Sequence, residues 1–195
     1  GVPPQAQGQR HQMGIGGAVS RRAVFLDRDG VINRAFVRAG RPYPPATLAE
    51  LEILPGVAPA LQRLHDAGYL LIVVTNQPDV ARGTALRADV EAIHEHLGRH
   101  LPIDEFRTCY HDTPDACACR KPQPGALLQA GQEHDIDLSA SWMVGDRWRD
   151  VEAGERAGCR TAFIDYGYAE PRPARADLTV GSLAEAARIL LGAPS

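Results

Sequence analysis

Short apolar runs alternate with helix-spaced apolar positions along most of this chain. Residues 23–26 and 69–74 are apolar without interruption, which is typical of strands buried on both faces of a parallel sheet. Between them, Val57, Leu61 and Leu64 repeat at helical spacing. The same alternation predicts helices around 86–98, 125–134, 148–157 and 182–191, and strands around 105–110, 141–144 and 160–164. Strands joined by single helices need crossover connections, so we expect a three-layer α/β/α fold with a mostly parallel sheet.

The linkers and ends of the chain predict one patterned domain. Residues 1–20 are rich in Gly, Gln and Pro and carry few bulky apolar groups, so we expect a flexible leader or a cloning remnant there. Residues 21–195 contain no Gly/Ser linker and no internal repeat, which indicates a single domain. The Pro-rich stretch 34–54 is too short for a second domain, so we expect no large cap over the site.

Composition and charge exclude several classes of protein. The chain has 195 residues with only four cysteines, a length that can bury a core without disulfides. No apolar run approaches the roughly 18 residues of a membrane span. Its 21 Lys and Arg against 24 Asp and Glu give a net charge of -3, which opposes a broad nucleic-acid-binding face. We therefore expect a cytoplasmic, monomeric protein that binds neither nucleic acid nor membrane.

Polar side chains follow the predicted strands at the points where those strands end. Asp27 and Asp29 come directly after the first strand, and residues 75–77, Thr-Asn-Gln, come after the second. Asp146 follows a later strand, and Asp150 lies one helical turn beyond it. Because ligands of open parallel sheets bind at the carboxyl ends of the strands, we expect these groups to form one site.

The chemistry of these groups favours phosphoryl transfer. Crowded carboxylates repel, and one would have to protonate unless a cation such as Mg²⁺ is shared between them. Residues 75–77 offer a hydroxyl and amides to an anion, and Arg120 and Lys121 add two cations. A carboxylate nucleophile, a cation and these donors together predict an aspartyl-phosphate intermediate. Singly, Asp-x-Asp is commonly a turn and Gly-Asp a helix cap, but their order after successive strands favours the site.

Three cysteines and a histidine fall within residues 109–119. The potential ligands are Cys109, His111, Cys117 and Cys119. They form two i, i+2 pairs, each of which points to one side of an extended chain, and Pro114-Asp115 allows a reversal between them. A tetrahedral Cys₃His zinc site follows. The alternatives are buried thiols with a chance histidine, or a redox disulfide between Cys117 and Cys119, which would leave the first pair unexplained.

The fourth cysteine and a group of helical histidines have simpler interpretations. Cys159 stands at the start of a predicted strand, where we expect a small buried hydrophobe. His94, His96 and His100 are interleaved with charged residues on one predicted helix. We expect a solvated helical face there rather than a second metal site.

Four segments together resemble the motifs of the haloacid dehalogenase (HAD) superfamily. They are Asp27-Arg28-Asp29-Gly30, Thr75-Asn76-Gln77, Cys119-Arg120-Lys121-Pro122 and Gly145-Asp146. Residues 22–190 look like its histidinol-phosphate and heptose-bisphosphate phosphatase branch, most closely the D-glycero-D-manno-heptose 1,7-bisphosphate 7-phosphatases. The resemblance implies a Mg²⁺-dependent phosphatase with a structural zinc that removes the 7-phosphate of this sugar, for the heptose of lipopolysaccharide. A histidinol-phosphate or other small-metabolite phosphatase is an alternative, and a catalytically silent zinc-bearing interaction module is one of another class.

The resemblance also implies a role for each residue. Asp27 would be the nucleophile and Asp29 the general acid and base, while Thr75 and Lys121 would hold the phosphoryl oxygens. The metals would be bound by Asp27, the backbone carbonyl of Asp29 and Asp146 for Mg²⁺, and by Cys109, His111, Cys117 and Cys119 for zinc. The substrate would be contacted by Asn33, Asn76, Gln77 and Arg120. Asp150 would orient Lys121 or a metal-bound water.

Two segments depart from the family pattern. Pro78-Asp79 stands where the family usually has Ser-Gly, which adds a carboxylate. Residues 34–38 replace polar residues of the family with a stretch that carries Arg34 and Arg38. These arginines could hold a second phosphate or could be solvated loop charges. The chemistry is therefore better supported than the substrate.

Overall fold

The computed structural model describes residues 20–192. The expected leader over residues 1–20 therefore lies, apart from Ser20, outside the described residues. The strands are β1 (Arg22–Leu26), β2 (Phe36–Arg38), β3 (Arg41–Tyr43), β4 (Tyr69–Asn76), β5 (Glu105–Cys109), β6 (Trp142–Gly145), β7 (Arg160–Ile164) and β8 (Leu178–Val180). The helices are α1 (Val57–Asp66), α2 (Pro78–Ala81), α3 (Arg87–His100), α4 (Gly125–Glu133), α5 (Trp148–Ala157) and α6 (Leu183–Leu190), with 3₁₀ turns at Leu48–Glu50, Thr113–Asp115 and Leu138–Ala140.

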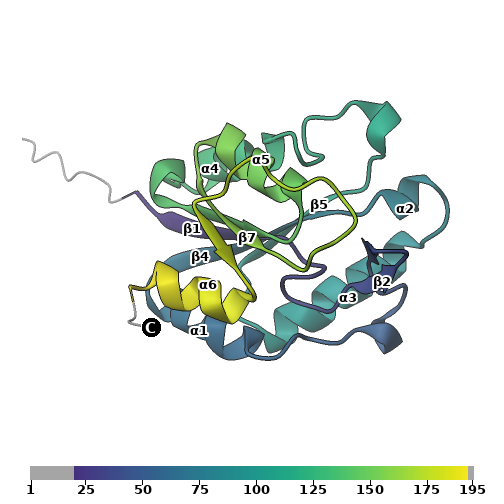
Figure 1. The fold of residues 1–195 in the computed structure, drawn as a ribbon, viewed down its shortest axis with the longest axis horizontal. Helices are drawn as coiled ribbons and strands as arrows, with labels where there is room; N and C mark the ends of the chain where they lie inside the picture. Colours follow the sequence, from purple (N-terminus) through teal and green to yellow (C-terminus); the bar gives the residue numbers. More distant parts are fainter. Residues whose placement is uncertain (1–19, 193–195) are drawn as a thin grey trace, which may run out of the picture.

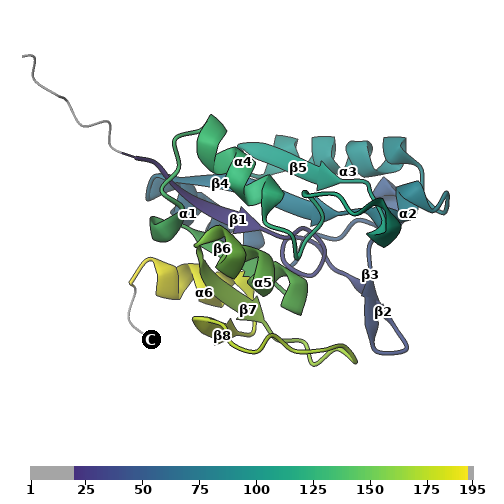
Figure 2. The same ribbon diagram turned by 90° about the horizontal axis from the view of Figure 1, so that it is seen from above.

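Six of these strands form one parallel sheet in the order β5-β4-β1-β6-β7-β8 (Figures 1 and 2). The chain builds outward from β1 in one direction through β4 and β5, then returns to the other side of β1 for β6, β7 and β8. Strand order thus reverses beside β1, where open α/β sheets bind their ligands. The expected α/β fold with a largely parallel sheet is confirmed.

Helices cover both faces of the sheet, as the uninterrupted apolar runs predicted. In β1, Val24 and Leu26 pack in a core with residues of α1, α3 and α6. Ala23 and Phe25 point to the opposite face and pack with residues of α4. All four side chains are fully buried. This arrangement makes three layers, with α1 and α6 on one side of the sheet and α4 and α5 on the other (Figure 1).

Four short elements, β2, β3, β8 and α2, were not predicted from the sequence. β2 and β3 form a two-stranded antiparallel hairpin that projects from the main body (Figure 2). β8 and α2 are only three and four residues long, respectively. Elements of this length show too few positions for a hydrophobic period to emerge.

The predicted chain reversal at Pro114-Asp115 is a 3₁₀ turn in which Asp112 accepts a hydrogen bond from the Thr113 N–H at 2.8 Å.

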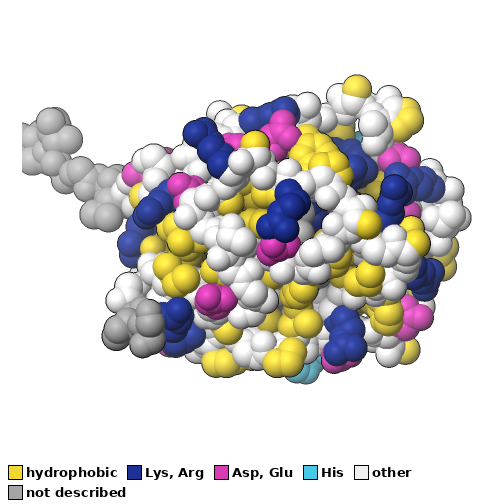
Figure 3. Space-filling view, viewed as in Figure 1, with side chains coloured by type: hydrophobic (Ala, Val, Ile, Leu, Met, Phe, Trp, Pro, Cys, Tyr) yellow, Lys and Arg dark blue, Asp and Glu magenta, His cyan; other side chains and the backbone are white. Residues whose placement is uncertain are grey.

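The surface carries charges of both signs. On the face shown in Figure 3, Lys and Arg side chains lie interspersed with Asp and Glu. Within residues 20–192, every helix is too short or too polar to cross a membrane. Cys159 is 8% exposed and packs in the core that contains Ala23, Phe25 and residues of α4, as expected for a small hydrophobe.

Candidate active site and Cys/His cluster

The carboxyl ends of β1, β4 and β6 bring the acidic residues and Thr75 to one edge of the sheet. β1 lies between β4 and β6, so Asp27, Thr75 and Asp146 meet at neighbouring strand ends. The Asp27 N–H donates to the carbonyl of Val144 at 2.9 Å, which extends the pairing of β1 with β6 by one residue. One oxygen from each of Asp27, Asp146 and Asp150 lies within 4.8 Å of the others. We call these three residues the acidic cluster.

Lys121 is the buried cation of this cluster. Its Nζ lies 2.7 Å from Asp27 Oδ1, 2.7 Å from Asp150 Oδ1 and 2.6 Å from the carbonyl of Val74. Burial alone would lower the pKa of Lys121, but Asp150 and Asp27 outweigh burial and raise it. The amine therefore stays charged and bridges two carboxylates. The other oxygen of Asp150 accepts the Arg147 N–H at 3.0 Å, so both oxygens of Asp150 have protein partners.

The negative charges of Asp27 and Asp146 are not fully balanced by Lys121. Burial raises the pKa of Asp27 to about 6; Asp150 and Asp29 add to the rise, and Lys121 opposes it. Burial, followed by the charges of Asp27 and Asp150, also raises the pKa of Asp146 well above its ordinary value. Crowded carboxylates with raised pKa values favour binding either a proton or a cation.

Asp146 has one carboxylate oxygen available for a metal. Its Oδ2 accepts the Tyr168 hydroxyl at 2.9 Å, whereas its Oδ1 is buried with no hydrogen-bond partner among the described residues. Gly30 approaches this carboxylate so closely that a Cβ there would lie 2.0 Å from Oδ2, and its φ of +89° also favours glycine. This oxygen and the nearby carboxylate of Asp27 are oxygen donors, the ligand type that Mg²⁺ prefers. These residues fit a Mg²⁺ ion.

Asp29 is held by four hydrogen bonds from three side chains. Arg28 donates from Nε to Oδ1 at 3.1 Å and from Nη2 to Oδ2 at 3.2 Å. Asn33 donates to Oδ1 at 3.0 Å, and Gln77 donates to Oδ2 at 2.8 Å. Donors to both oxygens fix the orientation of this side chain at the edge of the pocket.

Arg28 is fully buried and rests on His94, a residue of α3. Arg28 Nη1 lies 3.0 Å from His94 Nε2, and the His94 ring stacks on Phe106 with centroids 4.7 Å apart. Burial, then Arg28, lowers the pKa of His94 to about 4, so a neutral ring accepts the hydrogen bond. The expected solvated face is therefore wrong for His94, which points inward. His96 and His100 stack on one another with centroids 4.2 Å apart, and His100 is exposed.

The three amides expected to contact the substrate also form hydrogen bonds within the protein. Asn33 is fully buried and Gln77 is 3% exposed; besides the bonds described above, Gln77 donates to Thr75 Oγ1 at 2.9 Å. Asn76 clamps the backbone of Lys121, donating to its carbonyl at 3.0 Å and accepting its N–H at 3.1 Å. These bonds hold the neighbouring candidate catalytic residues in position, while contact of the amides with the substrate stays a prediction.

A pocket of about 280 Å³ opens over the acidic cluster. Its lining includes Asp27, Asp29, Asn76, Lys121 and Asp150, together with Arg41, Tyr43, Asp79, Arg82, Arg120, Arg147, Arg149 and Glu170. The two arginines that the sequence allowed as holders of a second phosphate do not line it. Arg34 pairs with Glu52 at 3.0 Å, and the Arg38 guanidinium lies 5.6 Å from the Tyr43 ring centroid.

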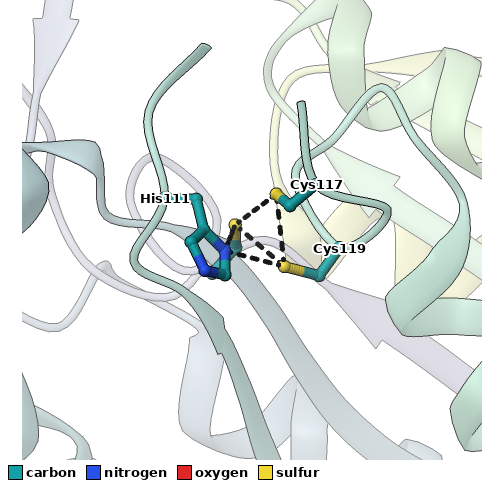
Figure 4. A group of neighbouring side chains, drawn as sticks. His111, Cys117 and Cys119 are labelled. Carbon is teal, nitrogen blue, oxygen red and sulfur yellow. Dashed lines mark hydrogen bonds between the residues drawn. The ribbon is translucent and has the colours of Figure 1, made fainter. Parts of the chain in front are cut away.

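The four potential zinc ligands converge after β5 (Figure 4). The sulfurs lie 3.1 Å apart for Cys109 and Cys119, 3.6 Å for Cys109 and Cys117, and 3.5 Å for Cys117 and Cys119. His111 Nδ1 lies 3.4 Å from Cys119 Sγ and 3.6 Å from Cys109 Sγ. All four cysteines of the chain are free thiols, which excludes the Cys117–Cys119 disulfide from this structure. Zn–S bonds of about 2.3 Å imply ligand separations of roughly 3.8 Å, so the cluster fits a zinc ion with a small expansion.

The Cys/His loop is tied to the rim of the pocket on two sides. Arg82, after α2, donates twice to Asp112 at 2.7 Å and once to Asp79 at 3.2 Å. Arg120 Nη1 donates to the carbonyl of His111 at 3.2 Å. Asp79, the carboxylate that departs from the family pattern, is thus part of an ion-pair network that links α2 to this loop.

Sequence reasoning missed the contribution of the segment after β7. Tyr168 bonds Asp146, and Tyr166 donates to the carbonyl of Gly30 at 2.9 Å. Glu170 pairs with Arg147 at the edge of the pocket. No hydrophobic period marks residues 165–177, so the available signal was only that aromatic and acidic residues follow the carboxyl end of a predicted strand.

Comparisons with known proteins place the chain in a family. Residues 118–186 match the HAD-hydrolase-like family model. The D-glycero-beta-D-manno-heptose-1,7-bisphosphate 7-phosphatase of Bordetella bronchiseptica is 35% identical over 176 residues, which cover 86% of this chain and 91% of that protein. The enzyme of the same name from Pseudomonas aeruginosa is 37% identical over 158 residues, covering 76% and 84%, respectively.

A solved structure agrees with these relatives. The crystal structure of the D,D-heptose 1,7-bisphosphate phosphatase of B. bronchiseptica, complexed with magnesium and phosphate, matches with a TM-score of 0.72 at 31% identity. The match covers 88% of this chain and 98% of that one. With its sheet order, its acidic cluster and relatives of this similarity, the chain belongs to the D-glycero-D-manno-heptose-1,7-bisphosphate 7-phosphatase family of HAD-like hydrolases.

Proposed function

We propose that this protein is a Mg²⁺-dependent phosphatase that removes the 7-phosphate of D-glycero-D-manno-heptose 1,7-bisphosphate. One observation carries the proposal: Asp27 is buried, paired with Lys121, and lies beside the unpartnered oxygen of Asp146. A carboxylate placed in this way can attack phosphorus while cations hold the phosphoryl oxygens. The names of the relatives support the choice of sugar.

The first half of the reaction transfers the phosphoryl group to Asp27. An oxygen of Asp27 attacks phosphorus, the bond from phosphorus to the sugar oxygen breaks, and Asp29 protonates the departing alkoxide. Lys121 and Thr75 hold the phosphoryl oxygens during the transfer. Mg²⁺ bound by Asp27 and Asp146 would supply the positive charge that lets a carboxylate approach a phosphate dianion.

The second half of the reaction returns the enzyme to its starting state. Asp29 takes a proton from a water molecule, whose oxygen attacks phosphorus. The bond between phosphorus and the Asp27 oxygen then breaks, which releases inorganic phosphate and the carboxylate. The product, a heptose 1-phosphate, would supply nucleotide-heptose synthesis in the cytoplasm.

We further propose that Cys109, His111, Cys117 and Cys119 hold a structural zinc. The distances among the ligand atoms support this role, as does the position of Arg120 and Lys121 one and two residues after Cys119. Zinc in small motifs contributes about 10–16 kcal/mol of apparent binding, enough to order this loop. The metal would thereby place Lys121 against Asp27.

The proposal is tested by phosphate release from heptose 1,7-bisphosphate, histidinol phosphate and 4-nitrophenyl phosphate, with Mg²⁺ and with chelator. We expect the heptose bisphosphate to give the highest kcat/KM, and Asp27→Asn to abolish turnover on all three. A preference for histidinol phosphate would replace the substrate. Wild-type protein as inactive as Asp27→Asn on every phosphomonoester would favour an interaction module without catalysis.

The role of Asp29 has its own test. Because the same group donates and then accepts a proton, Asp29→Asn should slow both phosphorylation of the enzyme and its hydrolysis by roughly 10²–10⁴-fold. Single-turnover kinetics with rapid quenching resolve the two steps. Equal rates in this variant and the wild type would show that another group is the acid.

A further inference from the structure

A buried chain of hydrogen bonds leads from helix α3 to Asp29, the acid of the proposed reaction. Its members are His94 on α3, Arg28 in the turn after β1, and the carboxyl group of Asp29. Arg28 is fully buried and His94 is 9% exposed. Within residues 20–192, neither of them lines the catalytic pocket, and no other residue of α3 does so. Any influence of His94 on the reaction must therefore pass through the side chains that separate it from the pocket.

Arg28 contacts both oxygens of Asp29 at once. Its Nε lies 3.1 Å from Oδ1, and its Nη2 lies 3.0 Å from Oδ1 and 3.2 Å from Oδ2. Asn33 and Gln77, by contrast, each donate to one oxygen. A donor to a single oxygen lets a carboxyl group turn about that contact, whereas a planar guanidinium that reaches both oxygens sets the plane of the group. The direction of the Asp29 carboxyl thus depends on the direction of the Arg28 guanidinium.

His94 anchors the remaining nitrogen of this guanidinium. Arg28 Nη1 lies 3.0 Å from His94 Nε2. Because a guanidinium can only donate, Nε2 is the acceptor, and the ring hydrogen is on Nδ1, which lies 3.5 Å from Thr108 Oγ1. The other constraint on the ring is its stacking on Phe106 of β5. Since the guanidinium is rigid, an acceptor fixed at Nη1 also fixes where Nε and Nη2 point.

Stability of the fold does not by itself call for these two polar side chains. The buried face of α3 is otherwise apolar, with Val90, Ile93 and Leu97 beside His94. Replacing buried ionic groups by apolar side chains of similar volume is often neutral or stabilising. A leucine at position 94 would continue the apolar face and would remove the need to bury a charge at position 28. The arrangement is better explained by what it does to Asp29.

We infer that His94 is a positioning residue that, through Arg28, aims the Asp29 carboxyl at the departing oxygen of the substrate. This inference rests on the proposed function and deepens it, because it assigns a helix outside the pocket to the proton-transfer step. In that step the bond from phosphorus to the sugar oxygen breaks while the proton of Asp29 passes to that oxygen, which leaves Asp29 as a carboxylate. The transfer needs the carboxyl within hydrogen-bond reach of the oxygen, so a carboxyl that turns away slows it.

The nature of the leaving group isolates this step. A sugar alkoxide needs a proton to depart, whereas 4-nitrophenolate leaves without one, and kcat/KM covers only the steps up to this departure. His94→Leu should lower kcat/KM for heptose 1,7-bisphosphate about 10- to 100-fold, a part of the 10²–10⁴-fold that a general acid contributes. It should leave kcat/KM for 4-nitrophenyl phosphate nearly unchanged. Equal losses on both substrates would overturn the inference and leave the phosphatase function standing.

Two more variants separate this effect from a loss of stability. His94→Gln keeps an acceptor oxygen near the position of Nε2 and should restore most of the wild-type kcat/KM for the bisphosphate. Leu97→Ala opens a cavity one turn further along the same buried face of α3 but retains the bond between His94 and Arg28. It should lower the Tm and keep the wild-type ratio of the two kcat/KM values. A ratio changed as much in Leu97→Ala as in His94→Leu would overturn the inference.

Coupling to Asp29 is tested in the background of Asp29→Asn. Adding His94→Leu to this variant should cause no further loss on the bisphosphate, because the group that His94 positions has already lost its proton. A second loss as large as that in the wild-type background would contradict the inference, since His94 would then act on the reaction without Asp29.

Crystal structures of the wild type and His94→Leu give a readout that does not need turnover. The plane of the Asp29 carboxyl should differ between them, together with the direction of the Arg28 guanidinium. An unmoved carboxyl would overturn the inference. If the wild type hydrolyses no phosphomonoester, the proposed function fails, while a carboxyl that turns in His94→Leu and stays in place in Leu97→Ala still shows that His94 positions Asp29.

Discussion

The acidic cluster and the Cys/His cluster gather potential metal ligands at the same edge of the sheet, but they are held in place by different forces. The carboxylates of Asp27, Asp146 and Asp150 emerge from buried strands and a buried helix start, and Lys121 bridges two of them. The Cys/His ligands lie on a loop in which only Cys109 is fully buried and His111 is exposed.

This difference indicates what each cluster needs from its metal. The acidic cluster is shaped by the sheet, by Lys121 and by Tyr168, so the protein arranges the ligands and a cation relieves their repulsion. In the Cys/His loop the ligand atoms lie within hydrogen-bond distance of one another (Figure 4). Under the proposed function, a metal ion would serve the chemistry at the first cluster and would hold the chain in place at the second.

The largest effect is expected from removing the bridging cation. Lys121→Met should lower the free energy of unfolding by about 3–5 kcal/mol, because Asp27 and Asp150 would remain buried without their partner. Turnover should also be lost. Urea unfolding measures the first effect, and Arg99→Met is the matched control, since its ion pair with Glu95 is exposed and contributes at most about 1 kcal/mol. A Lys121→Met protein as stable as the control would show that the sheet alone holds the carboxylates.

The pH dependence of the metal-free protein is the next largest effect. The folded pKa of Asp27, about 6, lies above its ordinary value of 3.8, so the protonated carboxyl favours folding below pH 3.8 and this contribution is lost as pH rises through 6. The loss amounts to about 3 kcal/mol, and Mg²⁺, which binds the carboxylate, should raise the Tm more at pH 7 than at pH 5. Thermal unfolding of wild type and Asp27→Asn across this range checks it. Identical pH profiles for the two proteins would contradict it.

Loss of zinc should lower turnover and leave the Mg²⁺ site intact. Cys119→Ser, or removal of zinc by a chelator followed by addition of Mg²⁺, should lower kcat/KM by about 100-fold because Arg120 and Lys121 lose their placement. The Mg²⁺ concentration for half-maximal activity should stay unchanged. Cys159→Ala is the control, since this buried thiol lies in the core and should leave the zinc content at one per chain. Full activity in a verified zinc-free protein would remove the link between the clusters.

The smallest effect concerns the hydroxyl that orients Asp146. Tyr168→Phe should weaken Mg²⁺ binding by about tenfold, the lower end for groups that hold a metal ligand. Tyr166→Phe removes a neighbouring hydroxyl that bonds the Gly30 carbonyl and should change Mg²⁺ affinity less. Binding of Mn²⁺ to the substrate-free protein, followed by electron paramagnetic resonance, compares the two variants. Equal affinities would show that burial alone orients Asp146.

Sequence patterns predicted the long elements and the chemistry at strand ends because both are local in the chain. Apolar runs such as 69–74 specify a buried strand, and a parallel sheet brings the residue after each strand to one edge. Which amide faces inward is not local. Gln77 bonds Asp29, 48 positions away, because the ends of β1 and β4 lie side by side in the sheet.

Long-range pairs account for the remaining differences. His94 lies 66 positions from Arg28, and Tyr168 lies 22 positions from Asp146, so no spacing rule links either pair. The interleaved charges around His94 indicated a solvated face, but the side chain sits on the inward-facing stripe of α3 beside Ile93 and Leu97. Hydrophobic periodicity does not predict that a polar side chain is buried when its partner lies on another element.

The hairpin β2–β3 contributes Arg41 and Tyr43 to the pocket, yet each of its strands is three residues long and no residue of it belongs to either core. A backbone hydrogen bond from the Ala169 N–H to the carbonyl of Gly40 joins its tip to the segment after β7. Insertions or replacements here would change which sugar is admitted with little effect on folding. The hairpin is thus the part of the molecule where substrate range can diversify in evolution, and where an engineer would place a library.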